Sequence, residues 1–181
     1  MKIAHKLIAA CALFACATAA LSHVTLQDSA AAAGASYRAA FRVSHGCDGS
    51  PTTTLQVMIP PGFEGAQPMP KPGWTLYTKI GPLEAPYEAH GKRHTDGVLE
   101  VRWEANGIEN ALPAAFYDEF VLRGTTPKKP GPLWFKVLQS CEQGVNAWVE
   151  VPASGSSTKG LKSPAALLEV LDVQPVGGHS H

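Results

Sequence analysis

The sequence predicts an all-β protein, built as an antiparallel β-sandwich of two sheets. Apolar and polar residues alternate in several short runs, which is the pattern of strands that bury one face. The 17 glycines and 15 prolines fall mostly between these runs, where they end strands and form turns. No stretch shows the helical period of about 3.6 residues. Short strands at this spacing are typical of sandwiches and flattened barrels.

The clearest strands are 37–43, 55–59 and 99–103, in which apolar residues occupy every second position. Pro60-Pro61-Gly62 ends the second of these runs. Weaker patterns predict further strands, giving about nine in all: 23–27, 74–80, 116–123, 133–140, 145–151 and 166–173.

The strand 145–151 carries an unusual tryptophan. Its odd positions are all valine or alanine, so they form one apolar face, and Trp148 falls on the opposite, more polar face. A large aromatic side chain on such a face is either covered by a loop as part of a secondary core or lies over a bound ligand. The pattern alone leaves both interpretations open.

The first 22 residues have the composition of a secretory signal peptide. Lys2 and Lys6 supply a basic start, residues 8–20 an apolar segment too short to span a membrane, and Ala20-Leu21-Ser22 a cleavage site. The chain would then begin at His23 after processing. Two alternatives remain, because 17–19 is also an acceptable cleavage triplet and Cys16 ends a loose lipoprotein box.

Removing 22 of the 181 residues leaves 159, enough for one domain with a substantial core. We assign this domain to residues 23–176 and a flexible tail, containing His179 and His181, to 177–181. Without Lys2 and Lys6, 13 of the 15 basic residues remain against 15 acidic ones, a net charge near −2. Such a balance gives no support to binding of nucleic acid or anionic lipid.

Two cysteines remain after the predicted cleavage, Cys47 and Cys141. An even pair in an exported chain predicts a disulfide, since the compartments outside the cytoplasm are oxidising. The alternative is a pair of thiolate ligands for Cu(I).

His23 at a free N-terminus would offer a metal two nitrogens from one residue, the α-amine and the ring Nδ1. Together they form a chelate ring suited to a borderline metal such as Cu(II). An amine, an imidazole and a carboxylate suit tetragonal Cu(II), whereas zinc usually takes a closed tetrahedral set of protein ligands.

Five segments together resemble the YcnI-like family of exported copper-binding proteins, in the expected order and over most of 23–152. The resemblance implies a cupredoxin-like or immunoglobulin-like sandwich that holds one Cu(II) through a single-histidine brace, an acidic residue from a loop and a nearby tryptophan. The segments are His23-Val-Thr-Leu, His45-Gly-Cys-Asp-Gly-Ser-Pro-Thr52, Met69-Pro-Lys-Pro-Gly-Trp-Thr75, Tyr117-Asp-Glu-Phe120 and Asn146-Ala-Trp-Val-Glu-Val-Pro152.

Carried over by position, the resemblance places the brace on His23 and the tryptophan on Trp148. The third ligand is open. In Gram-positive relatives a glutamate precedes the Pro-Thr pair, whereas this loop offers Asp48 as an oxygen ligand or His45 as a second imidazole. Many of those relatives also carry a C-terminal membrane helix. We expect none here and therefore a soluble periplasmic protein.

Three further polar residues have simpler explanations. Asp118 shares a strand face with aromatic residues, and we expect a structural ion pair with Arg42 or Arg102. His90 and His94 lie near Gly91 and Gly97, which favours a solvated loop.

The expected function is a periplasmic copper-binding protein, a chaperone or trafficking protein that receives Cu(II) from one protein and passes it to another. We expect no enzymatic activity. The alternatives are a copper-dependent oxidative enzyme that uses His23 with His45 as a second imidazole, or a metal-free exported interaction module.

Overall fold

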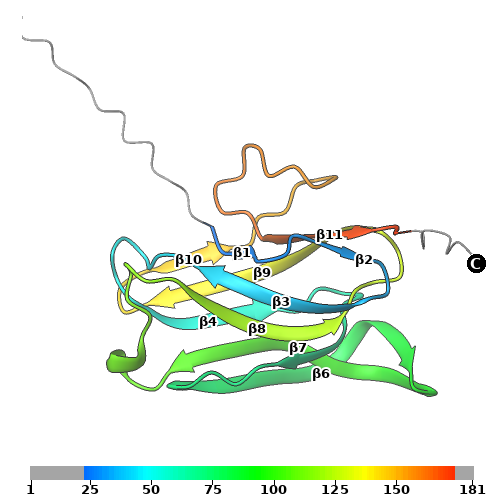
Figure 1. Cartoon of the computed structure of the whole chain (residues 1–181), viewed down its shortest axis with the longest axis horizontal. Helices are drawn as coiled ribbons and strands as arrows, with labels where there is room; N and C mark the ends of the chain where they lie inside the picture. The colour runs from blue at the N-terminus through cyan, green and yellow to red at the C-terminus, as the bar shows by residue number, and fades with distance from the viewer. Residues whose placement is uncertain (1–22, 174–181) are drawn as a thin grey trace, which may run out of the picture.

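The computed structural model describes residues 23–173, which form a sandwich of two β-sheets, as the sequence predicts (Figure 1). The first sheet has the order β1-β3-β8-β5 and the second β2-β11-β9-β4-β7-β6, with β10 also paired to β9. Every pairing is antiparallel except that of β2 with β11. The first sheet's strands are β1 (Thr25–Leu26), β3 (Ser36–Val43), β8 (Asp118–Thr125) and β5 (Glu64–Pro68). The second sheet's are β2 (Ala30–Ala32), β11 (Ala166–Leu171), β9 (Gly131–Cys141), β4 (Thr52–Met58), β7 (Lys92–Ala105), β6 (Trp74–Ala89) and β10 (Val145–Trp148).

The core lies between the sheets and contains the inward residues of both. Phe41 and Phe120 of the first sheet meet Phe135 and Trp103 of the second, in edge-to-face contacts at 5.4 Å and 5.7 Å respectively. All four rings are shielded from solvent, with exposed fractions of 0% to 1%. Tyr37, also inward, donates its hydroxyl hydrogen to the carbonyl of Asp28, and burial raises the pKa of its phenol.

The described residues form eleven strands, and sequence reasoning missed two of them, β2 and β5. β2 consists only of alanine, and β5 reads Glu-Gly-Ala-Gln-Pro, so neither shows the apolar alternation that reveals a strand. β6 and β7 are also much longer than predicted, with 16 and 14 residues. Register shifts within this hairpin and prolines in its outer half interrupt the alternation there.

The predicted facing of 145–151 is wrong. Trp148 is only 6% exposed and belongs to the core, whereas Val145 is 62% exposed. The register explains the inversion, because Trp148 lies opposite the fully buried Val137 of β9 and therefore points inward. Trp148 thus needs no special ligand to account for its burial.

The predicted signal peptide, residues 1–22, and the predicted tail, residues 177–181, lie outside the described residues. Within residues 23–173, no helix is long and apolar enough to cross a membrane. The helical structure described there is a single short 3-10 turn, η1 (Ile108–Asn110).

Candidate metal centre

The candidate site lies at one end of the sandwich, drawn at the left of Figure 1, where the loop 44–51 meets the turn between β9 and β10. The predicted disulfide between Cys47 and Cys141 is present, with the two Cα atoms 5.9 Å apart. It joins the loop to the end of β9. A further hydrogen bond runs from the backbone N–H of Gln143 to the hydroxyl oxygen of Ser50, at 2.8 Å. Loop and turn are therefore tied together covalently and by hydrogen bonds.

Asp48 occupies the exposed tip of this loop. The backbone groups of Cys47 and Ser50 bond each other in both directions, at 3.1 Å and 2.8 Å, and so enclose a two-residue turn. Asp48 and Gly49 adopt left-handed backbone conformations, with φ of 46° and 86°, as a tight hairpin turn requires. Aspartate tolerates this conformation better than most residues. The turn therefore gives Asp48 a structural role that is independent of metal binding.

His23 and His45 both contact Trp148. The His23 ring lies edge-on to the indole with 5.3 Å between centroids, and the His45 ring lies edge-on at 6.5 Å. The three side chains come from the start of the described chain, the loop before β4 and the end of β10. The fold thus brings together three of the four predicted ligand residues, with the two histidines on the indole of the third.

Each histidine ring also contacts a backbone carbonyl. His45 Nδ1 lies 2.6 Å from the carbonyl oxygen of Gly46, and His23 Nε2 lies at a longer 3.4 Å from that of Lys162. A carbonyl only accepts, so each contact is a hydrogen bond in the tautomer that carries the hydrogen on Nδ1 of His45 or on Nε2 of His23. Metal-binding histidines commonly donate their second ring nitrogen to a carbonyl in this way.

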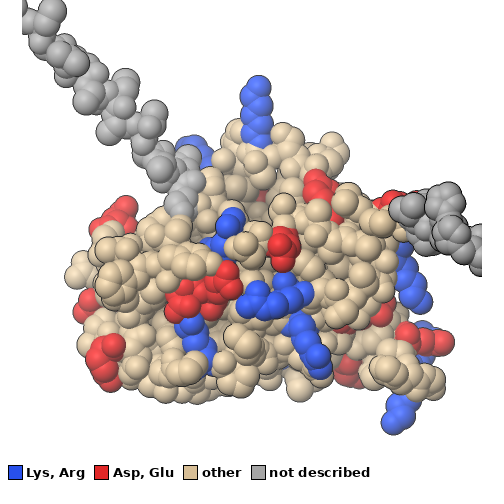
Figure 2. All heavy atoms as spheres, in the orientation of Figure 1, with Lys and Arg blue, Asp and Glu red and all other residues tan. Residues whose placement is uncertain are grey.

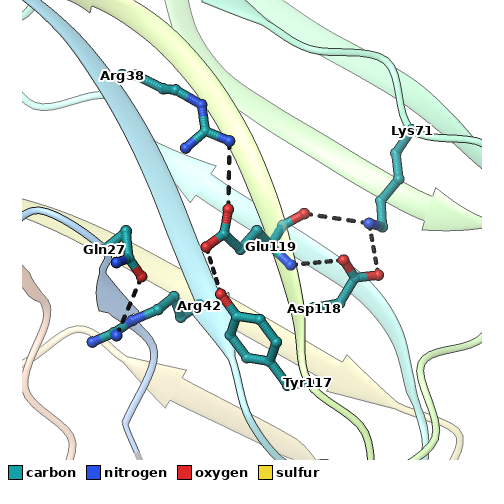
Figure 3. Close-up of polar contacts among 7 residues, drawn as sticks. All are labelled: Gln27, Arg38, Arg42, Lys71, Tyr117, Asp118 and Glu119. Atoms are coloured by element: carbon teal, nitrogen blue, oxygen red, sulfur yellow. Dashed lines mark hydrogen bonds and ion pairs between the residues drawn. The ribbon is translucent and has the colours of Figure 1, made fainter.

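Hydrogen bonds hold both the N-terminal segment that carries His23 and the loop before β11 that His23 contacts. For the loop, the Glu150 carboxylate accepts hydrogen bonds from the backbone N–H groups of Lys162 and Ser163, at 2.7 Å and 3.0 Å. For the N-terminal segment, the Arg42 guanidinium donates to the hydroxyl of Thr25 at 3.1 Å and, as Figure 3 shows, to the side-chain oxygen of Gln27. The N-terminal segment and the loop before β11 are therefore positioned independently of any metal.

Gln139 is the polar centre of the site, and sequence reasoning missed it. It is 1% exposed and its oxygen accepts from the Trp148 indole N–H at 3.1 Å. Its nitrogen donates to the His45 carbonyl at 2.7 Å and to the Thr52 hydroxyl at 2.8 Å. The available signal was its position in β9, where odd-numbered residues from 133 to 141 all face inward and Gln139 is the polar member of that set.

The outer face of β3 and β8 carries charges of both signs (Figure 2). Asp118 forms a structural ion pair, as predicted, but its partner is Lys71 at 2.6 Å and not Arg42 or Arg102. Arg38 pairs with Glu119, which also accepts the hydroxyl hydrogen of Tyr117 (Figure 3). That hydrogen bond raises the pKa of Tyr117. The charged side chains of Arg38, Glu119, Lys71 and Asp118 thus pair with one another on this outer face.

The structure separates the remaining candidates from this centre. His90 forms the exposed turn between β6 and β7, and His94 stacks on Tyr87 in the same hairpin, with ring centroids 4.8 Å apart. The prediction that both are solvated holds for His90, whereas His94 is half-buried. Among residues 23–173, no group of three or more His, Cys, Asp or Glu side chains is arranged to hold a metal ion. His23 and His45 are thus two imidazoles around an indole, without a third such ligand in place.

Comparison with known proteins gives a family and a fold. The chain is similar to the crystal structure of an uncharacterized protein from Nocardia farcinica with an immunoglobulin-like fold, with a TM-score of 0.61 and 24% identity over 82% of this chain and 97% of that one. No curated protein matches the chain. A family model described as a domain of unknown function, DUF1775, matches residues 23–170, in agreement with the YcnI-like resemblance. The chain therefore belongs to the DUF1775 family, and its β-sandwich is similar to the immunoglobulin-like fold of the Nocardia farcinica protein.

Proposed function

We propose that this chain is a periplasmic copper-binding protein that holds one Cu(II) ion at His23 and passes it between partner proteins. The observation that carries the proposal is the position of His23. Its ring packs on Trp148, and its Nε2 lies 3.4 Å from the Lys162 carbonyl oxygen, so the tautomer that donates to this carbonyl has its lone pair on Nδ1. Nδ1 is the ring nitrogen that can close a chelate with the α-amine of His23, once signal cleavage has freed that amine.

His45 is a better third ligand than Asp48 in this arrangement. Its ring flanks the same indole as that of His23, and its Nδ1 lies 2.6 Å from the Gly46 carbonyl oxygen, a contact typical of metal-binding histidines. Asp48 lies at the exposed tip of a turn that accounts for its conformation. A set of one amine and two imidazoles is nitrogen-rich and suits Cu(II), which binds such ligands most tightly among the common divalent metals.

Trp148 limits access to the ion from the protein side. Its indole N–H is already bonded to Gln139, so the indole offers the two histidines only its ring. A buried ring beside the metal excludes water and fixes the space available to the ligands.

The site suits transfer rather than permanent storage. His23 is half-buried and borders a groove of about 390 Å³ between β1 and β11, whose lining includes Leu26, Arg42 and Pro164. Few ligands and one accessible side allow an incoming protein to replace ligands one at a time. We therefore propose a copper donor and a copper acceptor as partners, and no catalysis.

The test combines intact-mass analysis of the exported protein with a Cu(II) titration followed by electron paramagnetic resonance. A mass that begins at His23 and a one-equivalent spectrum with nitrogen couplings support the proposal. Adding one alanine before His23 should abolish the high-affinity spectrum, because the chelate loses its amine. An unchanged spectrum in the extended protein, or a chain that begins at Ala20 or Cys16, overturns it.

Separate variants identify the third ligand. His45→Ala should remove one nitrogen coupling and weaken Cu(II) binding at least about tenfold, since one ligand is lost. Asp48→Asn should leave the couplings unchanged. His94→Ala is the matched control, because that histidine lies in the distant hairpin. The reverse pattern, loss in the Asp48 variant alone, would assign the third position to the carboxylate.

A further inference from the structure

We infer that Gln139 is a positioning residue of this site, whose one side-chain amide fixes both the Trp148 indole and the loop that carries His45. The inference concerns the copper-free protein first, and it bears on copper only through the function proposed above. The buried Gln139 amide then connects Trp148 with the loop that carries His45.

The geometry places four hydrogen bonds on this amide. The oxygen accepts from Trp148 Nε1 at 3.1 Å and, at a long 3.5 Å, from the amide of Asn146, which lies directly opposite on β10. The nitrogen donates to the backbone carbonyl of His45 at 2.7 Å and to the Thr52 hydroxyl at 2.8 Å. β10, β9, β4 and the loop 44–51 are therefore joined at one side chain.

Donor and acceptor chemistry fixes the orientation of the amide. An indole N–H can only donate, and a backbone carbonyl can only accept. The oxygen of Gln139 must therefore face Trp148 and its nitrogen must face His45, because the flipped amide would oppose donor to donor and acceptor to acceptor. No apolar residue can serve both partners at once.

Burial makes these bonds costly to lose. Gln139 and Thr52 are fully shielded from solvent, so water cannot replace a missing partner. The disulfide closes one side, with Cys141 Sγ 3.9 Å from the Thr52 hydroxyl. If the amide is removed, the indole N–H and the His45 carbonyl lose their partner together, and both flanks of the site are freed to move.

The consequence is that the distance between His45 and the indole depends on Gln139. His45 is attached through its own carbonyl, so the bond restrains the backbone from which the ring projects. His23 is affected only through its contact with the Trp148 ring. Loss of the amide should therefore disturb the His45 side more than the His23 side.

Two variants separate a positioning role from a role in folding. Gln139→Met removes both polar functions at nearly constant volume. Gln139→Glu keeps an acceptor for the indole but loses the donor to His45 when the carboxyl is ionised. When it is protonated, the carboxyl can both accept from Trp148 and donate to His45, so acid should restore the native arrangement. Gln143→Glu is the matched control, because its side chain is exposed in the turn after β9.

The first measurement is made without copper, by NMR of the Trp148 indole N–H and of the His45 ring. Gln139→Met should shift the indole resonance and speed its hydrogen exchange at least about tenfold, in line with the loss of a buried hydrogen bond. Gln139→Glu should match the His45 signals that wild-type protein gives at the same pH when the pH is low, and differ from them when the pH is high. Gln143→Glu should show neither effect. Native signals in Gln139→Met, with the chain folded, overturn the inference.

Copper titrations of the same proteins keep the two proposals apart. If wild-type protein binds Cu(II), Gln139→Met should weaken binding at least about tenfold while the coupling from His23 remains. Unchanged affinity and couplings would overturn the extension of this role to the metal. If wild-type protein binds no Cu(II), the proposed function fails, yet the copper-free NMR comparison still decides whether Gln139 positions Trp148 and His45.

Discussion

The two ends of the sandwich are held in different ways. At the end that contains the loop 44–51, a disulfide, a buried amide and a tight turn fix the chain in one arrangement. At the other end, to the right of Figure 1, the outer half of the β6–β7 hairpin is mostly exposed and turns at His90 and Gly91. Gly91 has open space around it, whereas Gly46 in the loop lies against other backbone.

The two ends therefore differ in how many interactions restrain them. The hairpin needs only a hydrogen-bonded ladder and a permissive turn to keep its shape. The loop end carries additional crosslinks although loops at the end of a sandwich are normally free to vary. Constraint beyond what folding requires is expected where side chains from several segments must keep a fixed geometry.

Removing the disulfide should have the largest effect. Replacing Cys47 and Cys141 together by serine should lower the free energy of unfolding by about 4 kcal/mol, because the crosslink closes a loop with a sequence separation of 94. Urea unfolding monitored by tryptophan fluorescence measures the loss. Wild-type protein unfolded under reducing conditions is the control and should approach the variant. A loss below about 1 kcal/mol would mean that hydrogen bonds alone hold the loop end.

The two glycines test the same contrast at the level of single atoms. A Cβ on Gly46 would lie 1.7 Å from the Ser50 carbonyl oxygen, and backbone cannot move aside as a flexible side chain can. Gly46→Ala should therefore cost about 3 kcal/mol and alter the His45 signals. A Cβ on Gly91 would have no neighbouring atom within 4 Å. Gly91→Ala should therefore lower the free energy of unfolding only through its positive φ of 71°, by about 1 kcal/mol. Equal costs measured by thermal unfolding would contradict the difference between the two ends.

The sequence was informative where local pattern decides the structure. Alternation located β3 and the central strands, and the parity of the cysteines gave the disulfide. It failed where long-range pairing decides. The all-alanine β2 is a strand because β11 lies beside it, and Trp148 points inward because its register with β9 is set elsewhere.

The candidate site shows the same division. The association of His23 with Trp148 could be anticipated from the family resemblance, whereas the pairing of Lys71 with Asp118 depends on where a distant loop arrives. Gln139 escaped notice because glutamine in a strand is ordinarily exposed. The sequence distinguishes Gln139 only by its position among the inward-facing residues of β9, which are otherwise apolar. Its hydrogen-bond partners lie on three other segments.

The smallest effect is expected for a substitution in the β6–β7 hairpin, His94→Ala. His94 stacks on Tyr87 with their rings nearly parallel, at 11°. His94→Ala should cost about 0.5 to 1 kcal/mol, the usual contribution of one partly exposed aromatic pair, and the loss should stay within the hairpin. Hydrogen exchange of β6 and β7 amides measures it, with Gln139 and Trp148 signals as the internal control. Faster exchange at the loop end as well would mean that the two ends unfold together, and that their separate restraints belong to one cooperative unit.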